Sequence, residues 1–282
     1  MKKVLITGAN SYIGTSVEKW LSQFENQYLV DTLDMLDSNW MNYDFSYYDA
    51  VFHVAGIVHK NEKNIDPDIY YKVNRDLTHK LAKLAKKSGV RQFIFLSTMS
   101  VYDSDEKIIT KETEEKPQNH YGKSKLEAEY LLKELCSKQF QVAIVRPPMV
   151  YGKDSKGNYS KLSKLSKWTL VFPNIDNQRS MIFIDNLSEF IKQLVDMELS
   201  GVYFPQNSEY ISTREMVVSI RRYHKKHTFL TSIINVMIYK LRFISQVNKL
   251  FGNLIYEKSM SEYCFEYQIR NFEESIILTE RE

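Results

Sequence analysis

Over the first two thirds of the chain, short apolar runs alternate with longer segments in which apolar residues recur at a helical period. The short runs predict strands at residues 3–7, 28–35, 50–56, 91–98 and 141–150, the last of which is stopped by Pro147 and Pro148. The periodic segments predict helices at residues 12–24, 69–89, 121–138 and 184–198, the second closed by Gly89. Strands that are apolar throughout and alternate with helices indicate βαβ units. We therefore expect an α/β fold in which helices cover both faces of a parallel sheet.

The pattern loosens after about residue 150. Residues 151–174 are rich in Lys, Ser, Gly and Asn, which predicts loop and a short helix. We expect residues 1–150 to form the α/β domain. Residues 151–282 are expected to form a smaller lobe, interleaved with the last strands of the sheet.

Composition excludes several classes of protein. The chain has 282 residues, enough for such a domain and lobe. Its formal net charge is only +3 and its basic residues form no concentrated stripe, so we expect no nucleic-acid partner. Cys136 and Cys264 are far apart and outside any CxxC pattern, which favours a reduced, cytoplasmic compartment. We find no secretory signal and no run of ~18 apolar residues, so we expect no membrane span.

The stretch TGANSYIG (7–14) predicts a phosphate-binding turn between the first strand and the first helix. Gly8 stands where the chain must turn tightly after the strand, and Gly14 where helix and strand must pack closely. Ser11 stands at the middle position, where it is small and its hydroxyl can bond to phosphate. The N-terminus of the helix would hold the pyrophosphate of a dinucleotide.

An acidic residue at the end of the second strand would bind the adenosine ribose of such a dinucleotide. Asp34 lies 20 positions after Gly14 and nearer the strand end than its competitor Asp31. A carboxylate there would repel a ribose 2′-phosphate, which favours NAD over NADP.

Tyr121 and Lys125 are four residues apart on a predicted helix, so their side chains share one face. A free tyrosine has a pKa of about 10. We expect the Lys125 ammonium to lower the pKa of Tyr121, so that the phenol exchanges a proton with a hydroxyl while hydride moves to or from a nicotinamide. Hydroxyl side chains at the end of the strand at 91–98 would orient a substrate oxygen toward Tyr121: Ser97, Thr98 and Ser100.

Six segments resemble, in order, the motifs of the extended short-chain dehydrogenase/reductases, in the branch of NAD-dependent epimerases and dehydratases that act on nucleotide sugars. They are TGANSYIG, HVAG (53–56), STMSVY (97–102), YGKSK (121–125), RPPMVYG (146–152) and RSMIFIDNL (179–187). Three segments are most similar to UDP-sugar 4-epimerases and 4-ketoreductases of polysaccharide synthesis: GIVHK (56–60), KGNY (156–159) and RSMIFIDNL. Residues 251–267 resemble that branch more weakly.

The resemblance implies a Rossmann-type doubly wound sheet that binds NAD through residues 1–150, with a small substrate-binding lobe at 151–282. It implies that Tyr121 is the general acid/base, that Lys125 holds the nicotinamide ribose, that Thr98 is the accompanying hydroxyl and that Asp44 contacts adenine. The implied cofactor residues are Gly8, Asn10, Ser11, Tyr12, Ile13, Gly14, Asp34, Asp44, Phe45, Val54, Ala55, Gly56, Tyr121 and Lys125. The implied substrate residues are Thr98, Ser100, Tyr121, Asn158 and Arg179, the last by charge-assisted bonds to a pyrophosphate.

The chain departs from the family pattern at three positions. Ser11 replaces a glycine of the phosphate loop, and Asp103 replaces a glycine that follows the strand at 91–98. Met149 replaces an asparagine that makes one substrate contact in the family. The chain is also shorter than typical epimerases.

These features favour an NAD-dependent epimerase acting at C4 of a UDP-sugar through a 4-keto intermediate. A UDP-4-keto-sugar reductase consuming NAD(P)H needs the same residues, so the two remain open. A nonenzymatic dinucleotide sensor on the same fold is the third hypothesis, although such proteins usually lose the Tyr–Lys pair that is present here. A homodimer is expected.

The remaining candidates have simpler interpretations. We interpret His53 as a packing or backbone-bonding residue, and we expect no metal site because no carboxylate or cysteine completes a set with His224 and His227. Lys161, Lys164 and Lys167 form a basic edge, interpreted as a solvated face rather than a steering patch for an anionic substrate. The amphipathic residues 229–243 favour a buried helix or an oligomer contact over docking to a membrane surface.

Overall fold

The fold is built on a parallel sheet of six strands. The computed structural model describes residues 1–58, 66–103 and 105–281. The sheet has the order β10-β6-β4-β3-β1-β2 and every neighbouring pair is parallel. Its strands are β1 (Lys2–Thr7), β2 (Tyr28–Leu33), β3 (Ala50–His53), β4 (Gln92–Leu96), β6 (Gln141–Val145) and β10 (Gly201–Tyr203). The predicted Rossmann-type α/β fold is therefore confirmed.

The strand predicted to begin at Gln141 ends before Pro147 and Pro148, as expected. The chain leaves the sheet after Val145, where Pro147 and Pro148 have no N–H to continue the ladder. It then forms β7 (Met149–Tyr151), which pairs with β9 (Met181–Phe183) in a separate two-stranded sheet.

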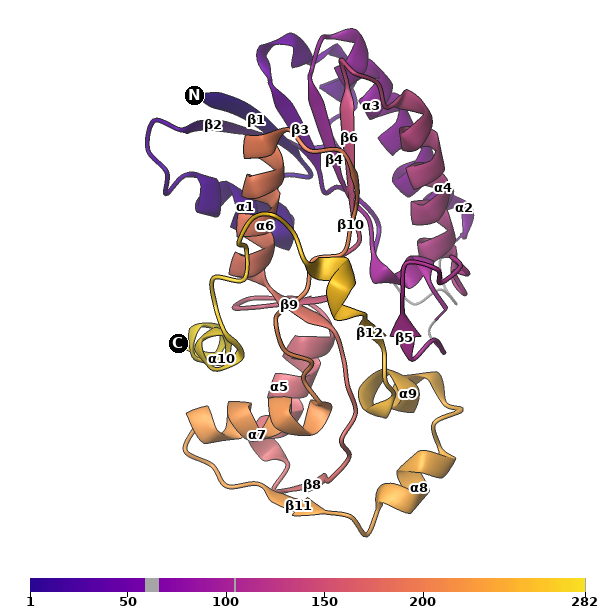
Figure 1. Ribbon diagram of the computed structural model, residues 1–282, viewed down its shortest axis with the longest axis vertical. Coiled ribbons are helices and arrows are strands. Elements are labelled where there is room, and N and C mark those ends of the chain that lie inside the picture. The colour runs from indigo at the N-terminus through magenta and orange to yellow at the C-terminus, as the bar shows by residue number, and fades with distance from the viewer. Residues whose placement is uncertain (59–65, 104, 282) are drawn as a thin grey trace.

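Helices cover both faces of the sheet, as the apolar strands require (Figure 1). On one face, α1 (Tyr12–Leu21) and α6 (Ile184–Met197) bury residues such as Val17 and Leu187 against the strands. On the other face lie α3 (Thr78–Lys87) and α4 (His120–Leu135). The helix predicted at 69–89 is divided into α2 (Asp68–Tyr70), a π-helical stretch (Tyr71–Leu77) and α3, and it ends before Gly89, whose φ is +86°.

The second half of the chain adds a lobe below the sheet in Figure 1. Its helices are α5 (Asn158–Trp168), α7 (Thr213–Tyr223), α8 (Asn235–Lys240), α9 (Ser245–Phe251) and α10 (Phe272–Glu280). Two small parallel sheets join it, one of β8 (Val171–Pro173) with β11 (Phe229–Thr231) and one of β5 (Ile108–Ile109) with β12 (Ile255–Tyr256). Short 3₁₀ helices lie at Ser38–Asn42, Phe45–Tyr47, Met99–Val101 and Lys258–Ser261.

Residues 229–243 do not form the buried helix that their pattern favours. They form β11 and the short α8, and of the α8 side chains only Ile238 is buried. The reason is that α8 lies at the outer end of the lobe, where no further element covers it (Figure 1). Within the described residues, no helix has the length and apolar character needed to cross a bilayer.

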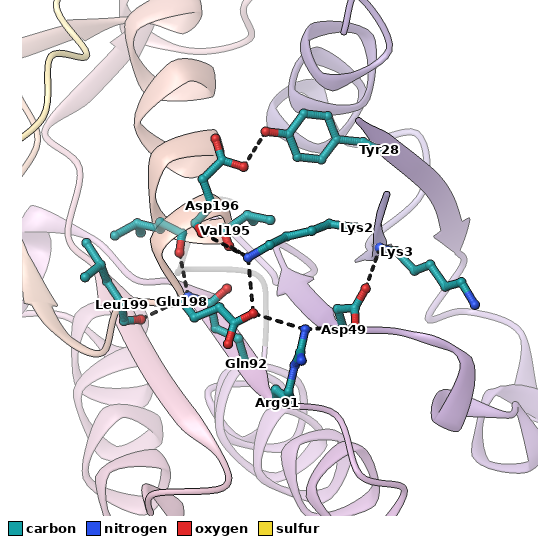
Figure 2. A network of polar contacts seen from close by, with 11 residues as sticks. Lys2, Lys3, Tyr28, Asp49, Arg91, Gln92, Val195, Asp196, Glu198 and Leu199 are labelled. Atoms are coloured by element: carbon teal, nitrogen blue, oxygen red, sulfur yellow. Dashed lines mark hydrogen bonds and ion pairs between the residues drawn. The ribbon is translucent and has the colours of Figure 1, made fainter. Parts of the chain in front are cut away.

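A polar network closes the amino-terminal edge of the sheet (Figure 2). The Lys2 ammonium donates to the carbonyls of Val195 and Asp196 at 2.6 and 3.0 Å and so caps the C-terminus of α6. Arg91 pairs with both Asp49 and Glu198 at 3.0 Å. Because α6 and β10 are held to this edge, the opposite edge, where the strands end, is the one available to ligands.

Candidate active site

The turn after β1 has the backbone that a phosphate loop requires. Gly8 has a φ of +109° and Asn10 a φ of +64°, both in the left-handed region. A Cβ at Gly8 would lie 2.7 Å from the Ala55 nitrogen, so no larger residue fits there. The turn lies where the strand order reverses, since β2 flanks β1 on one side and β3 on the other.

Ser11 occupies the N-cap of α1, which explains why a serine replaces the middle glycine. Its backbone is extended, and its Oγ accepts a hydrogen bond from the Gly14 nitrogen at 3.1 Å. A Cβ at Gly14 would lie only 2.6 Å from that oxygen and 3.1 Å from Val54. The N–H groups of Tyr12 and Ile13, the first two of the helix, have no intrahelical acceptor and carry the positive end of the helix dipole. This cradle fits a dinucleotide pyrophosphate.

Tyr12 contributes to the loop through its backbone and not through its ring. The ring packs against the lobe cluster that contains Tyr151 and Ile184. Its hydroxyl is buried without a hydrogen-bond partner in the described residues, and burial raises the pKa of Tyr12. A Cβ at Gly152 would lie 2.5 Å from that hydroxyl, so the ring fills the space between α1 and the lobe.

The predicted adenosine end of the site lies beside this turn. Asp34 directly follows β2 and is exposed, and its Oδ1 accepts from the Leu36 nitrogen at 2.9 Å. The Gly8 nitrogen bonds to the Leu33 carbonyl at 2.9 Å, which sets Asp34 next to the loop. Asp31, the competitor, is bonded to the Tyr48 hydroxyl at 2.8 Å.

Asp44 and Phe45 lie at the start of a 3₁₀ helix. The exposed Asp44 caps this helix through Ser46, and the hydrogen bonds from Ser46 lower the pKa of Asp44. Phe45 is buried in the core, so only its backbone faces the surface of the site.

The loop after β3 is held beside Lys125 by a residue that the sequence patterns missed. The buried Asn74 accepts from the Ile57 nitrogen at 2.9 Å and donates to the Ile57 carbonyl and to Ser124, each at 3.1 Å. A Cβ at Gly56 would lie 2.9 Å from the Asn74 oxygen and 3.3 Å from Lys125 Nζ. The sequence does hold a signal for this role, because Asn74 is a polar residue in the middle of a predicted amphipathic helix. His59 and Lys60 of GIVHK lie outside the described residues.

Thr98 and Tyr121 are brought together by a close approach of α4 to the loop after β4. Asn119 caps α4 by accepting from the Gly122 nitrogen at 2.8 Å. A Cβ at Gly122 would lie 2.2 Å from the Ser100 carbonyl oxygen, so only glycine permits this contact. Tyr121, which is buried, hydrogen bonds with Thr98, and Thr98 Oγ1 in turn accepts from the Ser100 nitrogen at 3.1 Å.

The expectation that Lys125 lowers the pKa of Tyr121 is wrong. Burial raises the pKa of Tyr121 to about 12, and the hydrogen bond with Thr98 is the effect that opposes it. Lys125 is buried as well, which lowers the pKa of its ammonium to about 7, an effect that the nearby Glu129 opposes. Lys125 Nζ donates to the Leu96 carbonyl at 2.9 Å and lies 4.4 Å from the centre of the Phe95 ring.

A buried ion pair lies beneath these groups and was also missed. Glu129 and Arg146 are almost fully buried and are joined by three hydrogen bonds of 2.5 to 3.1 Å. Arg146 also donates to Tyr102 at 2.6 Å and pairs with Glu115 at 2.9 Å. Ser97 donates to Glu129, so the network reaches the residue just before Thr98.

His53 lies under the same edge of the sheet. Its ring is buried and stacks on Phe95, which confirms the packing interpretation. Its nitrogens bond to the hydroxyls of Thr7 and Thr78 at 2.7 and 2.9 Å rather than to backbone. Burial, and to a smaller extent the charge of Lys125, lowers the pKa of His53 to about 3. The ring is therefore neutral at neutral pH and does not act as an acid or base there.

The remaining predicted substrate residues lie on separate elements. Asn158 is exposed at the start of α5. Arg179 lies two residues before β9, and its side chain donates to the Gly252 carbonyl at 3.2 Å. Among the residues that the structure describes, no carboxylate pairs with Arg179, and burial lowers its pKa to about 10, so it is a cation at neutral pH. In the described ranges no three potential metal ligands lie together.

Comparisons with known proteins agree with this geometry. The chain is 29% identical over 278 residues to a UDP-glucose 4-epimerase of Vibrio cholerae, which covers 89% of this chain and 83% of the relative. It is 28% identical over 241 residues to an N-acetyl-alpha-D-glucosaminyl-diphospho-ditrans,octacis-undecaprenol 4-epimerase of Escherichia coli O157:H7, covering 78% and 71%.

The fold is shared with solved structures and the family is clear from the sequence. A UDP-N-acetylglucosamine 4-epimerase of Bacillus cereus superposes with a TM-score of 0.79 over 98% of this chain and 97% of that one, at 15% identity. Residues 4–203 match the family described as NAD dependent epimerase/dehydratase. This chain is a member of the NAD-dependent epimerase/dehydratase family.

Proposed function

We propose that the protein is an epimerase acting at C4 of a UDP-sugar. The observation that carries the proposal is the buried Thr98–Tyr121 hydrogen bond, set beside Lys125 and a dinucleotide-type turn at the carboxyl edge of the sheet. Bound NAD would accept hydride from the sugar carbon and return it to either face. A hydroxyl-bearing carbon oxidised in this way must lose its hydroxyl proton, and Tyr121 is the group placed to take and return it.

The residues divide into three roles in this proposal. Tyr121 exchanges the proton of the 4-hydroxyl, Thr98 orients that oxygen, and Lys125 holds the nicotinamide ribose. Residues of the turn and its flanks hold the rest of the dinucleotide: Gly8, Asn10, Ser11, Tyr12, Ile13, Gly14, Asp34, Asp44, Phe45, Val54, Ala55 and Gly56. The unit at 1–150 thus binds the cofactor and that at 151–282 supplies the substrate lobe.

The proposed substrate class is supported by what the two relatives have in common. Their names state UDP-glucose and an N-acetylglucosaminyl diphospho-undecaprenol, which are both sugars joined to a carrier through a diphosphate. Arg179, a half-buried cation without a carboxylate partner among the described residues, is proposed to bind that diphosphate. Ser100 and Asn158 complete the proposed substrate set. A role in surface polysaccharide synthesis, a cytoplasmic location and a homodimer are part of the same proposal.

Reduction of a UDP-4-keto-sugar by NAD(P)H is the alternative, because it needs the same proton donor and the same cofactor turn. A nonenzymatic sensor is less well supported, since Tyr121 and Lys125 are both present and positioned.

The test is turnover of UDP-sugars by the wild type and by Tyr121→Phe. We expect C4 epimerisation without added NAD(P)H, and a rate about 10²–10⁴-fold lower for Tyr121→Phe because the proton-transfer group is lost. Tyr130→Phe is the matched control, since Tyr130 is on the same helix but 48% exposed. Unchanged turnover by Tyr121→Phe contradicts the mechanism, and NAD(P)H consumption with a 4-keto sugar, without epimerisation, selects the reductase.

A further inference from the structure

The outer end of the lobe exposes large apolar side chains. We call the region formed by residues 165–171 and 229–244 the lobe tip. Of the 22 large apolar side chains that are exposed in the described residues, twelve lie in this region. The most exposed, between 57% and 89%, are Trp168, Phe229, Ile233, Val236, Met237 and Phe243. Exposed apolar residues gathered in this way mark a docking surface, unlike the scattered ones found on every protein.

The elements that carry these side chains are joined to one another. β8 and β11 are paired, with Val171 opposite Phe229. The Asn235 side chain at the start of α8 donates to the Asn174 carbonyl at 2.8 Å, just after β8. Lys226 Nζ donates to the Lys167 carbonyl at 2.9 Å, which joins the end of α5 to the start of β11. Figure 1 shows these elements together at the end of the molecule farthest from the sheet.

Charge is segregated onto the same part of the chain. Residues 155–175 and 216–256 contain eleven Lys and Arg residues and no Asp or Glu. The rest of the chain has 27 basic residues (38 less these 11) against 35 acidic ones. Among the described residues, seven of the eight lysines of these segments form no ion pair: Lys156, Lys161, Lys164, Lys225, Lys226, Lys240 and Lys249. The lobe tip and the segments that flank it therefore combine exposed apolar side chains with an excess of cationic ones, on a protein that is otherwise acidic.

We propose that the lobe tip docks on the surface of an anionic lipid bilayer. Trp168 and Phe243 would enter the boundary between headgroups and acyl chains, while the surrounding lysines meet lipid phosphates. The partner must supply both an apolar interior and negative charge. A second copy docking by the same tip would instead bring the cationic side chains of these segments against one another. The proposal uses no catalytic residue, so it stands or falls separately from the epimerase proposal.

The first measurement is sedimentation of the whole protein with vesicles. Vesicles of phosphatidylcholine mixed with phosphatidylglycerol are compared with vesicles of phosphatidylcholine alone. We expect binding at least about 10-fold stronger to the anionic vesicles, and weaker binding as salt is raised. Absence of binding to the anionic vesicles, or equal binding to both kinds, overturns the proposal.

Matched variants locate the contact. The double variants Trp168→Ser with Phe243→Ser, and Lys161→Glu with Lys164→Glu, are expected to lower vesicle binding at least about 10-fold. The controls are Leu36→Ser, which removes a side chain 93% exposed elsewhere, and Lys83→Glu with Lys87→Glu on α3. An equal loss of vesicle binding in the control variants overturns the proposal. It is also overturned if the protein binds no vesicles but self-associates in solution, and the tip variants abolish that self-association. Thermal unfolding of each variant shows that it is folded.

Discussion

Beneath Tyr121 the protein buries charged groups, whereas at the lobe tip it exposes apolar ones. Arg146 and Glu129 are 1% and 0% exposed, while Trp168 and Ile233 are each 89% exposed. Both arrangements oppose the usual distribution of residues between core and surface. Both are unfavourable unless another interaction compensates for the buried charge or the exposed apolar area. In the first region the compensation is internal, because each charge has a bonded partner. In the second region, the proposed bilayer would provide it.

Glu129→Gln should produce the largest effect of the changes that test this contrast. It leaves the buried Arg146 with its main counter-charge removed, and we expect the free energy of unfolding to fall by about 3–5 kcal/mol. Urea denaturation measures it. Glu127→Gln, on the same helix, removes an exposed partner of Arg75 and should cost no more than about 1 kcal/mol. Similar losses for the two variants would show that the buried pair is not the stronger one.

His53 sharpens the same side of the comparison through pH. Its pKa is about 3 in the folded protein and 6.5 ordinarily, so between these values the unfolded state binds more protons. Above pH 6.5 the ring is neutral in both states and costs the folded protein nothing. As the pH falls below 6.5, the free energy of unfolding decreases by about 1.4 kcal/mol per pH unit because of this one group. Urea denaturation of wild type and His53→Gln at several pH values should show the steeper decline in the wild type. The exposed His227→Gln serves as control; parallel curves for wild type and His53→Gln would refute the assignment.

Phe243→Ala should have the smallest effect. Phe243 is 82% exposed, so we expect the free energy of unfolding to change by less than about 0.5 kcal/mol. Phe172→Ala, at a side chain 4% exposed in the same lobe, should cost about 3–5 kcal/mol. A large loss for Phe243→Ala would mean that this ring is buried in solution, and the contrast between the two regions would fail.

The sequence was sufficient for features that depend on neighbouring residues. Five of the six strands of the sheet, the turn from Gly8 to Gly14 and the end of a helix before Gly89 each follow from local patterns, whereas the short edge strand β10 was not predicted. The pairing of Glu129 with Arg146 joins α4 to the residue after β6, and no local pattern links them. The pKa of Tyr121 was mispredicted for the same kind of reason, because burial depends on what the rest of the chain packs around a residue. The exposure of residues 229–243 likewise depends on which elements do not cover them.

The contact between Gly122 and Ser100 has a consequence for how such enzymes can diversify. The hydrogen bonds that fix Tyr121 against Thr98 come from Asn119, Gly122 and Ser100, all on the sheet side of the molecule. The loop that carries Thr98 is also held from the lobe, because Met99, Val101 and Tyr102 share one buried cluster with Tyr256 and Met260. Substitutions in the lobe near Tyr256 therefore reach the position of Thr98 against Tyr121, so the two halves of the molecule vary together rather than separately.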